Sequence, residues 1–276
     1  MATVLALSAA LSFGVSDIAG AMAARRSSAL QVALGLQLFG LPVLLVGLLL
    51  LPGTVTLRAL ALGVLAGAVG NLGLVLYLRS MAVGPVGVIS PLSALVGAAV
   101  PVAWGVWLAG DELDAWQLAG VAAGLIAVVL VAYAPGAAQR AYGSRGPIFA
   151  LIAGTAFGLF FVVLDATPAD SGLWPLVGSR IGGTALLLGL LVAAPRPLPG
   201  RASVPLIALS GVTDMLANLL FLLATREGLL SLASLLTSLY PVVALLAARV
   251  LLAERLTRLQ GLGVALALAA TALLVG

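Results

Sequence analysis

The chain has 276 residues, of which 63% are hydrophobic and only 8% are charged. So few polar side chains cannot cover the surface of a water-soluble globule, so the composition predicts a protein embedded in a lipid bilayer. The formal net charge is +4, which we assign to loop arginines that fix membrane orientation and not to nucleic-acid binding. The chain contains no histidine and no cysteine, which excludes disulfides, thiolate nucleophiles and imidazole acid–base chemistry.

Apolar stretches follow one another along the whole chain. A spanning helix needs roughly 20 mostly apolar residues. The first stretch is expected to remain in the mature protein, because its basic pair Arg25 and Arg26 follows the apolar residues, whereas a signal peptide carries basic residues before them. The connections are short, so we expect one all-α integral membrane domain. The ten predicted transmembrane helices span residues 2–24, 30–51, 58–80, 84–108, 115–134, 147–165, 172–194, 203–225, 229–250 and 257–275.

The segment 2–24 carries an intramembrane acid, Asp17. Ser12 and Ser16 lie four residues apart just before it, which places their hydroxyls on one face of a helix. Snorkelling of Asp17 toward the arginines at the end of the segment is the simpler interpretation. Binding of a proton or of a cationic substrate is the alternative.

Two other segments carry matching stripes of small residues. Residues at spacings of three and four share a helix face, where they allow close helix packing or line a cavity. Prolines in both segments favour the cavity somewhat, because they free backbone carbonyls within the membrane. The stripe in 229–250 is Ser231, Ser234, Ser238 and Pro241, and the stripe in 84–108 is Gly87, Ser90, Ala94, Gly97 and Pro101.

The segment 203–225 carries Asp214 near its middle, the residue with the highest free-energy cost of placement in a bilayer. A charged side chain at the bilayer centre costs about 2.5–3.5 kcal/mol even on lenient scales. Asn218 and Phe221 continue the same face, so this face is expected to point at protein or water. Asp214 either binds a proton or a substrate ammonium group, or it forms a structural ion pair with Arg180, the one arginine well inside a predicted helix.

Aromatic residues make up only 5% of the chain, so their positions are informative. Tryptophans near predicted helix ends fit the interfacial belt of membrane proteins. Aromatics inside helices either pack in the core or line an apolar cavity suited to an aromatic or aliphatic substrate. The interior set is Phe13, Tyr77, Phe157, Phe160, Phe161, Phe221 and Tyr240.

The end of the chain repeats a segment from its middle. Residues 108–132 align without a gap with residues 251–275, at an offset of 143, with 9 of 25 positions identical. Gln117 matches Gln260, and the acid Asp111 matches Glu254. The chain therefore divides into two five-helix repeats, residues 1–134 and 147–276, joined by a linker at 135–146. An odd number of helices inserts the second copy the opposite way round, so an inverted repeat is predicted.

Loop charges differ between the two sides of the membrane. Ten arginines fall in loops after the odd-numbered segments, against two in the loops of the other side. The positive-inside rule then places the Arg-rich side in the cytoplasm and both termini outside.

These repeats resemble the EamA family of the drug/metabolite transporter superfamily. Each repeat opens with an Ala-rich helix that carries Phe-Gly (Phe13, Phe157), and the second closes with a Leu-x-x-acid, Gln, Gly-Val pattern around Glu254. The resemblance implies a ten-helix secondary transporter, with aromatic amino acid exporters as the nearest kind. Members of the family usually have both termini in the cytoplasm, the reverse of what the arginines indicate.

We therefore expect an exporter of small neutral metabolites, most of all amino acids, that acts without cofactors as a monomer in the cytoplasmic (inner) membrane. Protons are a candidate coupling ion. Alternatives are exchange of sugar phosphates or nucleotide sugars, proton-coupled export of cationic drugs, and a non-transporting scaffold. The absence of His, Cys and paired intramembrane carboxylates speaks against an enzyme. The candidate binding residues are Ser12, Phe13, Asp17, Tyr77, Ser90, Phe157, Phe161, Arg180, Asp214, Asn218, Phe221, Ser231, Ser234, Ser238 and Tyr240.

Overall fold

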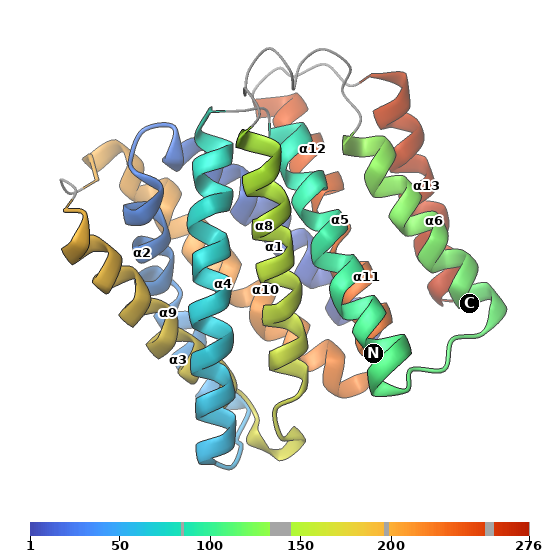
Figure 1. Cartoon of the computed structure of the whole chain (residues 1–276), viewed down its shortest axis with the longest axis horizontal. Helices are drawn as coiled ribbons and strands as arrows, with labels where there is room; N and C mark the ends of the chain where they lie inside the picture. The colour runs from blue at the N-terminus through green and yellow to red at the C-terminus, as the bar shows by residue number, and fades with distance from the viewer. Residues whose placement is uncertain (84–85, 133–144, 196–198, 252–256, 276) are drawn as a thin grey trace.

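The structure is a computed structural model that describes the chain except residues 84–85, 133–144, 196–198, 252–256 and 276 (Figure 1). Most of the expected linker at 135–146, and the motif acid Glu254, lie outside the described residues. The described part is helical. Its main helices are α1 (Ala2–Ala24), α2 (Ala29–Phe39), α3 (Leu41–Leu50), α4 (Leu57–Val83), α5 (Val86–Trp104), α6 (Ala115–Ala132), α8 (Arg145–Asp165), α9 (Trp174–Ala193), α10 (Val204–Glu227), α11 (Leu230–Thr237), α12 (Tyr240–Leu251) and α13 (Arg258–Val275).

The predicted class, an all-α membrane protein, is confirmed. Within the described residues, eight helical stretches are long and apolar enough to cross a bilayer. A ninth apolar helix, Ala115–Ala127, is shorter. The prediction of ten spanning helices is therefore matched for eight of them. Short connections are also described: a π-helical turn at Gly105–Ala109 and single 3₁₀ turns at Ala169–Ser171 and Arg201–Ser203.

Two of the predicted segments are broken in the middle. The segment 30–51 divides into α2 and α3 next to Pro42, and the segment 229–250 divides into α11 and α12 next to Pro241. Proline has no backbone N–H and its ring crowds the carbonyl four residues earlier, so an α-helix is interrupted there. Pro91 and Pro101, in contrast, lie within α5 without ending it.

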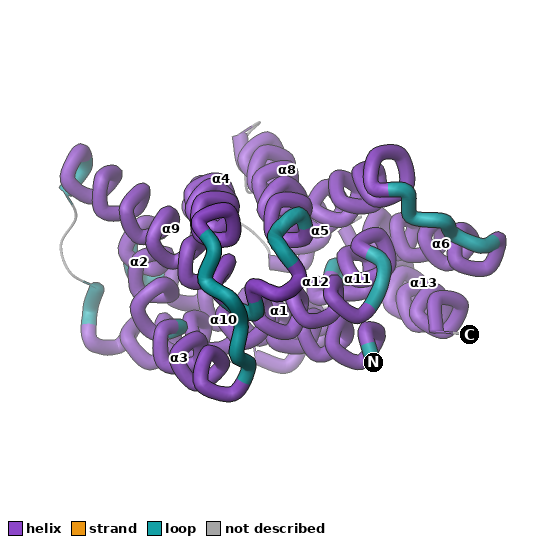
Figure 2. Tube along the Cα trace, turned by 90° about the horizontal axis from the view of Figure 1, so that it is seen from below, coloured by secondary structure: helices purple, strands orange, loops and turns teal. Residues whose placement is uncertain are grey.

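The helices form two layers, which Figure 2 shows end on. One layer contains α9, α4, α8, α5 and α6, and the other contains α2 with α3, α10, α1, α11 with α12, and α13. Each layer mixes helices from both halves of the chain: α4 packs on α8 and α9, while α1 packs on α10. The segments that the sequence repeats, α6 and α13, lie side by side at one edge of the molecule (Figure 1).

Glycines allow α4 and α9 to approach each other closely. Gly63 and Gly67 of α4 face the backbone of α9, and Gly178 and Gly182 of α9 face the backbone of α4. A Cβ atom on Gly67 would overlap the carbonyl group of Ser179, and one on Gly182 would overlap that of Val64. Small residues at a spacing of four are the usual means by which transmembrane backbones come together. This close contact between α4 and α9 fixes the position of the part of α9 that carries Arg180.

An acidic residue outside the membrane spans joins the two halves. Asp111 follows the π-helical turn after α5, and its carboxylate accepts hydrogen bonds from the backbone N–H and the hydroxyl of Ser231, at 3.0 and 2.6 Å. Ser231 lies in the first turn of α11, whose N-cap residue Leu229 has no side-chain acceptor. Asp111 therefore satisfies one backbone N–H at the start of α11, that of Ser231, which the cap residue leaves open.

Candidate functional site

A cavity lies between the two layers, near the middle of the helices. Its volume is about 100 Å³, which is room for several water molecules. The lining residues come from α1, α2, α4, α5, α8, α9, α10 and the break between α11 and α12. They are Phe13, Ser16, Asp17, Gln37, Gly70, Asn71, Leu74, Tyr77, Ser93, Ala94, Gly97, Phe157, Phe160, Phe161, Leu176, Ser179, Arg180, Asp214, Met215, Asn218, Ser238 and Tyr240.

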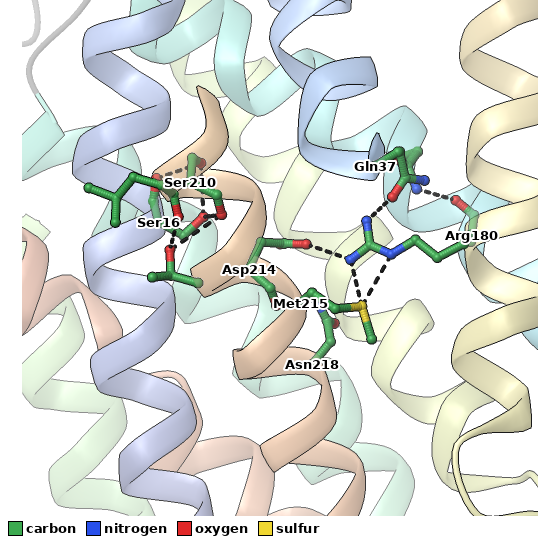
Figure 3. Close-up of polar contacts among 11 residues, drawn as sticks. Ser16, Gln37, Arg180, Ser210, Asp214, Met215 and Asn218 are labelled. Atoms are coloured by element: carbon green, nitrogen blue, oxygen red, sulfur yellow. Dashed lines mark hydrogen bonds and ion pairs between the residues drawn. The ribbon is translucent and has the colours of Figure 1, made fainter. Parts of the chain in front are cut away.

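One polar group of the cavity is built around Arg180 of α9. Its Nη2 atom lies 3.1 Å from Oδ2 of Asp214, and its Nη1 donates to the side-chain oxygen of Gln37 (Figure 3). The guanidinium also lies against the sulfur of Met215, 3.2 Å from Nε and 2.9 Å from Nη2. The side chains of Arg180 and Asp214 are 9% and 18% exposed. The predicted ion pair therefore exists, and it borders the cavity.

Asp17 of α1 forms the second polar group. Its Oδ2 atom accepts hydrogen bonds from the hydroxyl of Tyr77, at 2.5 Å, and from that of Ser90, at 2.7 Å. Asp17 thus binds residues of α4 and α5 across the layer boundary. The prediction that it snorkels toward the arginines at the end of α1 is wrong, because hydroxyl donors in the opposite layer hold its carboxylate at the cavity.

Serine hydroxyls hold α1 and α10 together beside these groups. The hydroxyl of Ser16 donates to the backbone carbonyl of Ser210 at 3.0 Å, and the hydroxyl of Ser210 donates to the backbone carbonyl of Ser16 at 2.9 Å (Figure 3). Hydrogen bonds of this kind join helices inside the membrane, where no water competes for the donors. They fix the spacing between the helices that carry Asp17 and Asp214.

Aromatic side chains form the apolar wall. Phe13 contacts Phe161 edge-on and also packs on Tyr240, with ring centroids 6.2 and 6.0 Å apart. Tyr77 meets Phe157 in a T-shaped contact at 5.5 Å. The cavity therefore combines charged groups with an aromatic surface, the combination that binds a small molecule with a charged head and an apolar body.

The structure brings together most of the candidate residues named from the sequence. Ten line the cavity directly: Phe13, Asp17, Tyr77, Phe157, Phe161, Arg180, Asp214, Asn218, Ser238 and Tyr240. Ser90 reaches it through Asp17. Phe221 is fully buried behind Phe161, with ring centroids 4.2 Å apart.

The remaining candidates lie elsewhere. Ser12 donates to the carbonyl of Ser8 within α1. Ser231 binds Asp111 at the start of α11, and Ser234 is fully buried. The serine stripe of the segment 229–250 is therefore divided between two environments. Its first two members lie in packed surroundings, and Ser238, at the break before Pro241, lines the cavity.

Sequence reasoning did not name several lining residues. Asn71 is a single carboxamide in the apolar helix α4, a signal strong enough to find it, and it donates to the carbonyl of Gly67. Gln37 lies in α2, whose other carboxamide is Gln31, and aligns with Arg180 at the offset of the repeat. Met215 could not be identified from the sequence, because methionine is an ordinary residue of apolar helices. Among the residues that the structure describes, no three His, Cys, Asp or Glu side chains converge as a metal ion requires.

Comparison with known proteins finds a family model and solved structures that are similar to this chain. Residues 144–276 match the model of the EamA-like transporter family, the part of the chain whose closing motif resembled that family most. A solved structure, titled only as the crystal structure of a protein, is similar with a TM-score of 0.75 over 99% of this chain and 95% of its own. Its sequence is 19% identical, so the likeness shows the fold alone. No curated protein matches the sequence.

Proposed function

We propose that this chain, whose second half belongs to the EamA-like transporter family, is a secondary transporter of small zwitterionic metabolites, above all amino acids with aromatic or other neutral side chains. The observation that carries the proposal is the cavity between the two layers. It presents a guanidinium, two carboxyl groups and an aromatic wall to one small space. An amino acid offers the complementary set, with a carboxylate, an ammonium group and an apolar body.

The charges of the cavity favour this substrate class over phosphorylated ones. Arg180 is the cation that lines the cavity, and Asp214 already pairs with it. Asp17 adds a second carboxyl group. A sugar phosphate or nucleotide sugar would bring further negative charge, and a phosphate site needs cations that are free to bind it. Exchange of such compounds is therefore the weaker candidate.

Export of cationic drugs is the second candidate function, and Asp17 is the observation that favours it. Its carboxylate is bound by two hydroxyls, which carry no charge to offset its own. A cation or a proton is the natural partner for such a group inside a membrane. The Arg180 guanidinium in the same cavity speaks against purely cationic substrates, because it repels them.

Alternating access between two inverted repeats is the mechanism that we propose. The contacts between the halves support it, because α1 packs on α10 and α8 packs on α4. These two contacts are equivalent if a two-fold axis relates residues 1–134 to residues 147–276, since α1 and α8 open the two repeats and α4 and α10 are the third spans of each. On this proposal, ten helices span the cytoplasmic (inner) membrane, the Arg-rich loops face the cytoplasm, and one chain suffices for transport. A scaffold would have no use for charged groups around an internal cavity.

A competition screen in proteoliposomes tests the substrate class. Uptake of radiolabelled L-phenylalanine is measured against unlabelled neutral amino acids, a cationic dye and glucose 6-phosphate. We expect the amino acids to compete and the phosphate not to. Inhibition by the phosphate would favour the exchanger, and inhibition by the dye alone would favour the drug exporter.

A further inference from the structure

The donors of Arg180 are used unequally. Nη1 donates to the amide oxygen of Gln37, and Nη2 lies 3.1 Å from the carboxylate of Asp214. The edge formed by Nε and Nη2 lies against the sulfur of Met215, at 3.2 and 2.9 Å, and Asp214 is the other group that contacts this edge, through Nη2 (Figure 3). A single thioether sulfur therefore receives two N–H groups of one buried guanidinium.

This pairing is chemically poor. A thioether is a weak hydrogen-bond acceptor, whereas the Nε/Nη2 edge is a fixed fork that matches the two oxygens of a carboxylate. Bidentate bonds between arginine and a carboxylate are among the strongest polar contacts in proteins. The best binding edge of an intramembrane cation is thus covered by the weakest of its three partners.

The side chain of Met215 is able to move away from the Nε/Nη2 edge of Arg180. It is fully buried on α10, yet it borders the cavity together with Arg180. Its side chain is unbranched with three rotatable bonds, so it can adopt another rotamer without moving the helix. Gln37 binds Nη1, and Asp214 binds Nη2, which carries two N–H groups, so these two partners can hold Arg180 while the sulfur leaves.

We propose that the Met215 thioether is a placeholder for the substrate carboxylate, which displaces it and binds the Nε/Nη2 edge of Arg180 in bidentate fashion. The inference rests on the proposed function and makes it more specific. The site selects for the carboxylate itself, and the ammonium group of the substrate is left to the carboxyl groups of the same cavity. An amide or ester analogue lacks the second anionic oxygen and leaves the fork incompletely bonded, which is a strong basis for rejection.

Methionine methyl signals test the displacement directly. The chain contains four methionines, so a protein labelled with [methyl-¹³C]methionine in nanodiscs gives a simple spectrum. It is titrated with L-phenylalanine and with L-phenylalaninamide. We expect the Met215 signal to shift with saturation on adding the amino acid and to stay in place on adding the amide. Met81 of α4 is also fully buried but packs in a different part of the apolar core from Met215, so it is the internal reference.

Met215→Leu assigns the signal and removes the acceptor at nearly constant volume, with Met81→Leu as the matched control. We expect Met215→Leu to lower the Kd for L-phenylalanine on the order of three- to ten-fold, because the substrate carboxylate no longer has to displace the weak hydrogen bonds between the thioether and Arg180. If this variant does not fold, Met81→Leu and Met22→Leu assign Met215 by elimination, since Met1 is the exposed terminal residue.

The outcomes separate the two proposals. A Met215 signal that does not move while proteoliposomes take up L-phenylalanine overturns the displacement and leaves the transport function standing. Equal shifts with the amide also overturn it. A saturable shift with the amino acid, without any uptake, supports the carboxylate site and contradicts the transport of that amino acid.

Discussion

At the scale of single residues, the energetic cost of burying charge explains what the sequence reveals. Asp214, Asp17 and Arg180 stand out because ionisable groups within apolar segments require a partner or a function. The sequence also indicated the pairing of Asp214 with Arg180, and the structure has it. It did not indicate the partners of Asp17, because Tyr77 and Ser90 lie 60 and 73 residues away and only the packing of α1 against the other layer brings them together.

The ion pair is expected to respond asymmetrically to substitution. Asp214→Asn leaves a buried guanidinium that cannot lose its proton, so we expect a loss of roughly 3–5 kcal/mol in the free energy of unfolding. Arg180→Gln leaves a carboxyl group, which a proton can neutralise, so a smaller loss is expected. The double variant should recover much of the loss of Asp214→Asn. Thermal unfolding in detergent measures all three, and equal effects of the two single variants would contradict this account.

Asp17→Asn is expected to weaken binding without breaking the local structure. The amide oxygen of Asn still accepts from Tyr77 and Ser90, so only the charge is lost. A hydrogen bond to a charged group contributes about 1.5–3 kcal/mol, so the KM for L-phenylalanine should rise by roughly 10- to 100-fold. If protons are the coupling ion, stimulation of uptake by a pH gradient should be present in the unaltered protein and absent in this variant. Unchanged kinetics would remove Asp17 from the binding site.

Asp114→Asn is the matched control for this experiment. Asp114 is an exposed acid whose carboxylate accepts from the backbone N–H of Gln117 at 2.8 Å, as the cap of α6. Asparagine is an equally good cap residue, so uptake and stability should both remain at the level of the unaltered protein.

At the scale of elements, composition and proline positions predict the helices but not all of their breaks. Each predicted segment coincides with helical structure in the described residues, because apolar runs in a bilayer must satisfy their backbone groups internally. Pro42 and Pro241 separate helices, while Pro91 and Pro101 are accommodated within α5. Tertiary packing decides whether a proline ends a helix or is accommodated within it, and this packing cannot be predicted from a single sequence.

The glycine contact between α4 and α9 predicts a contrast within one helix. Gly182→Ala places a methyl group against the backbone of Val64, whereas Gly189→Ala places one where no atom outside the surrounding helix backbone lies within 4 Å. Alanine improves helix propensity equally at both sites, by about 1 kcal/mol. Overpacking costs about 1–3 kcal/mol, so Gly182→Ala should destabilise the protein while Gly189→Ala should not. Unfolding of both variants in detergent checks this, and equal stability would show that the contact is not tight.

At the scale of the whole molecule, the internal repeat was the informative feature of the sequence. It indicated which segments correspond, and the corresponding helices α6 and α13 lie together. It did not indicate that the two halves interleave into layers, because each layer forms only when helices of both halves meet. The location of the cavity between the layers follows from this interleaving, so the sequence could name lining residues but not the space that they enclose.

Orientation in the membrane is tested by labelling, because the chain has no cysteine of its own. Glu112→Cys places a thiol in the acidic loop, and Gly200→Cys places one in the Arg-rich loop, where a Cβ meets no neighbour. The positive-inside rule predicts that an impermeant maleimide added to intact cells labels the first and not the second. The reverse pattern would place both termini in the cytoplasm, as is usual in the family.

We propose that the cavity is the substrate site of an alternating-access carrier for amino acids. A counterflow assay tests this proposal: proteoliposomes loaded with unlabelled L-phenylalanine are diluted into a trace of labelled L-phenylalanine, with liposomes that lack the protein as the control. A carrier exchanges inner for outer substrate, so the label should accumulate transiently above its equilibrium level. A label that only approaches equilibrium, or that does not enter, would contradict the claim.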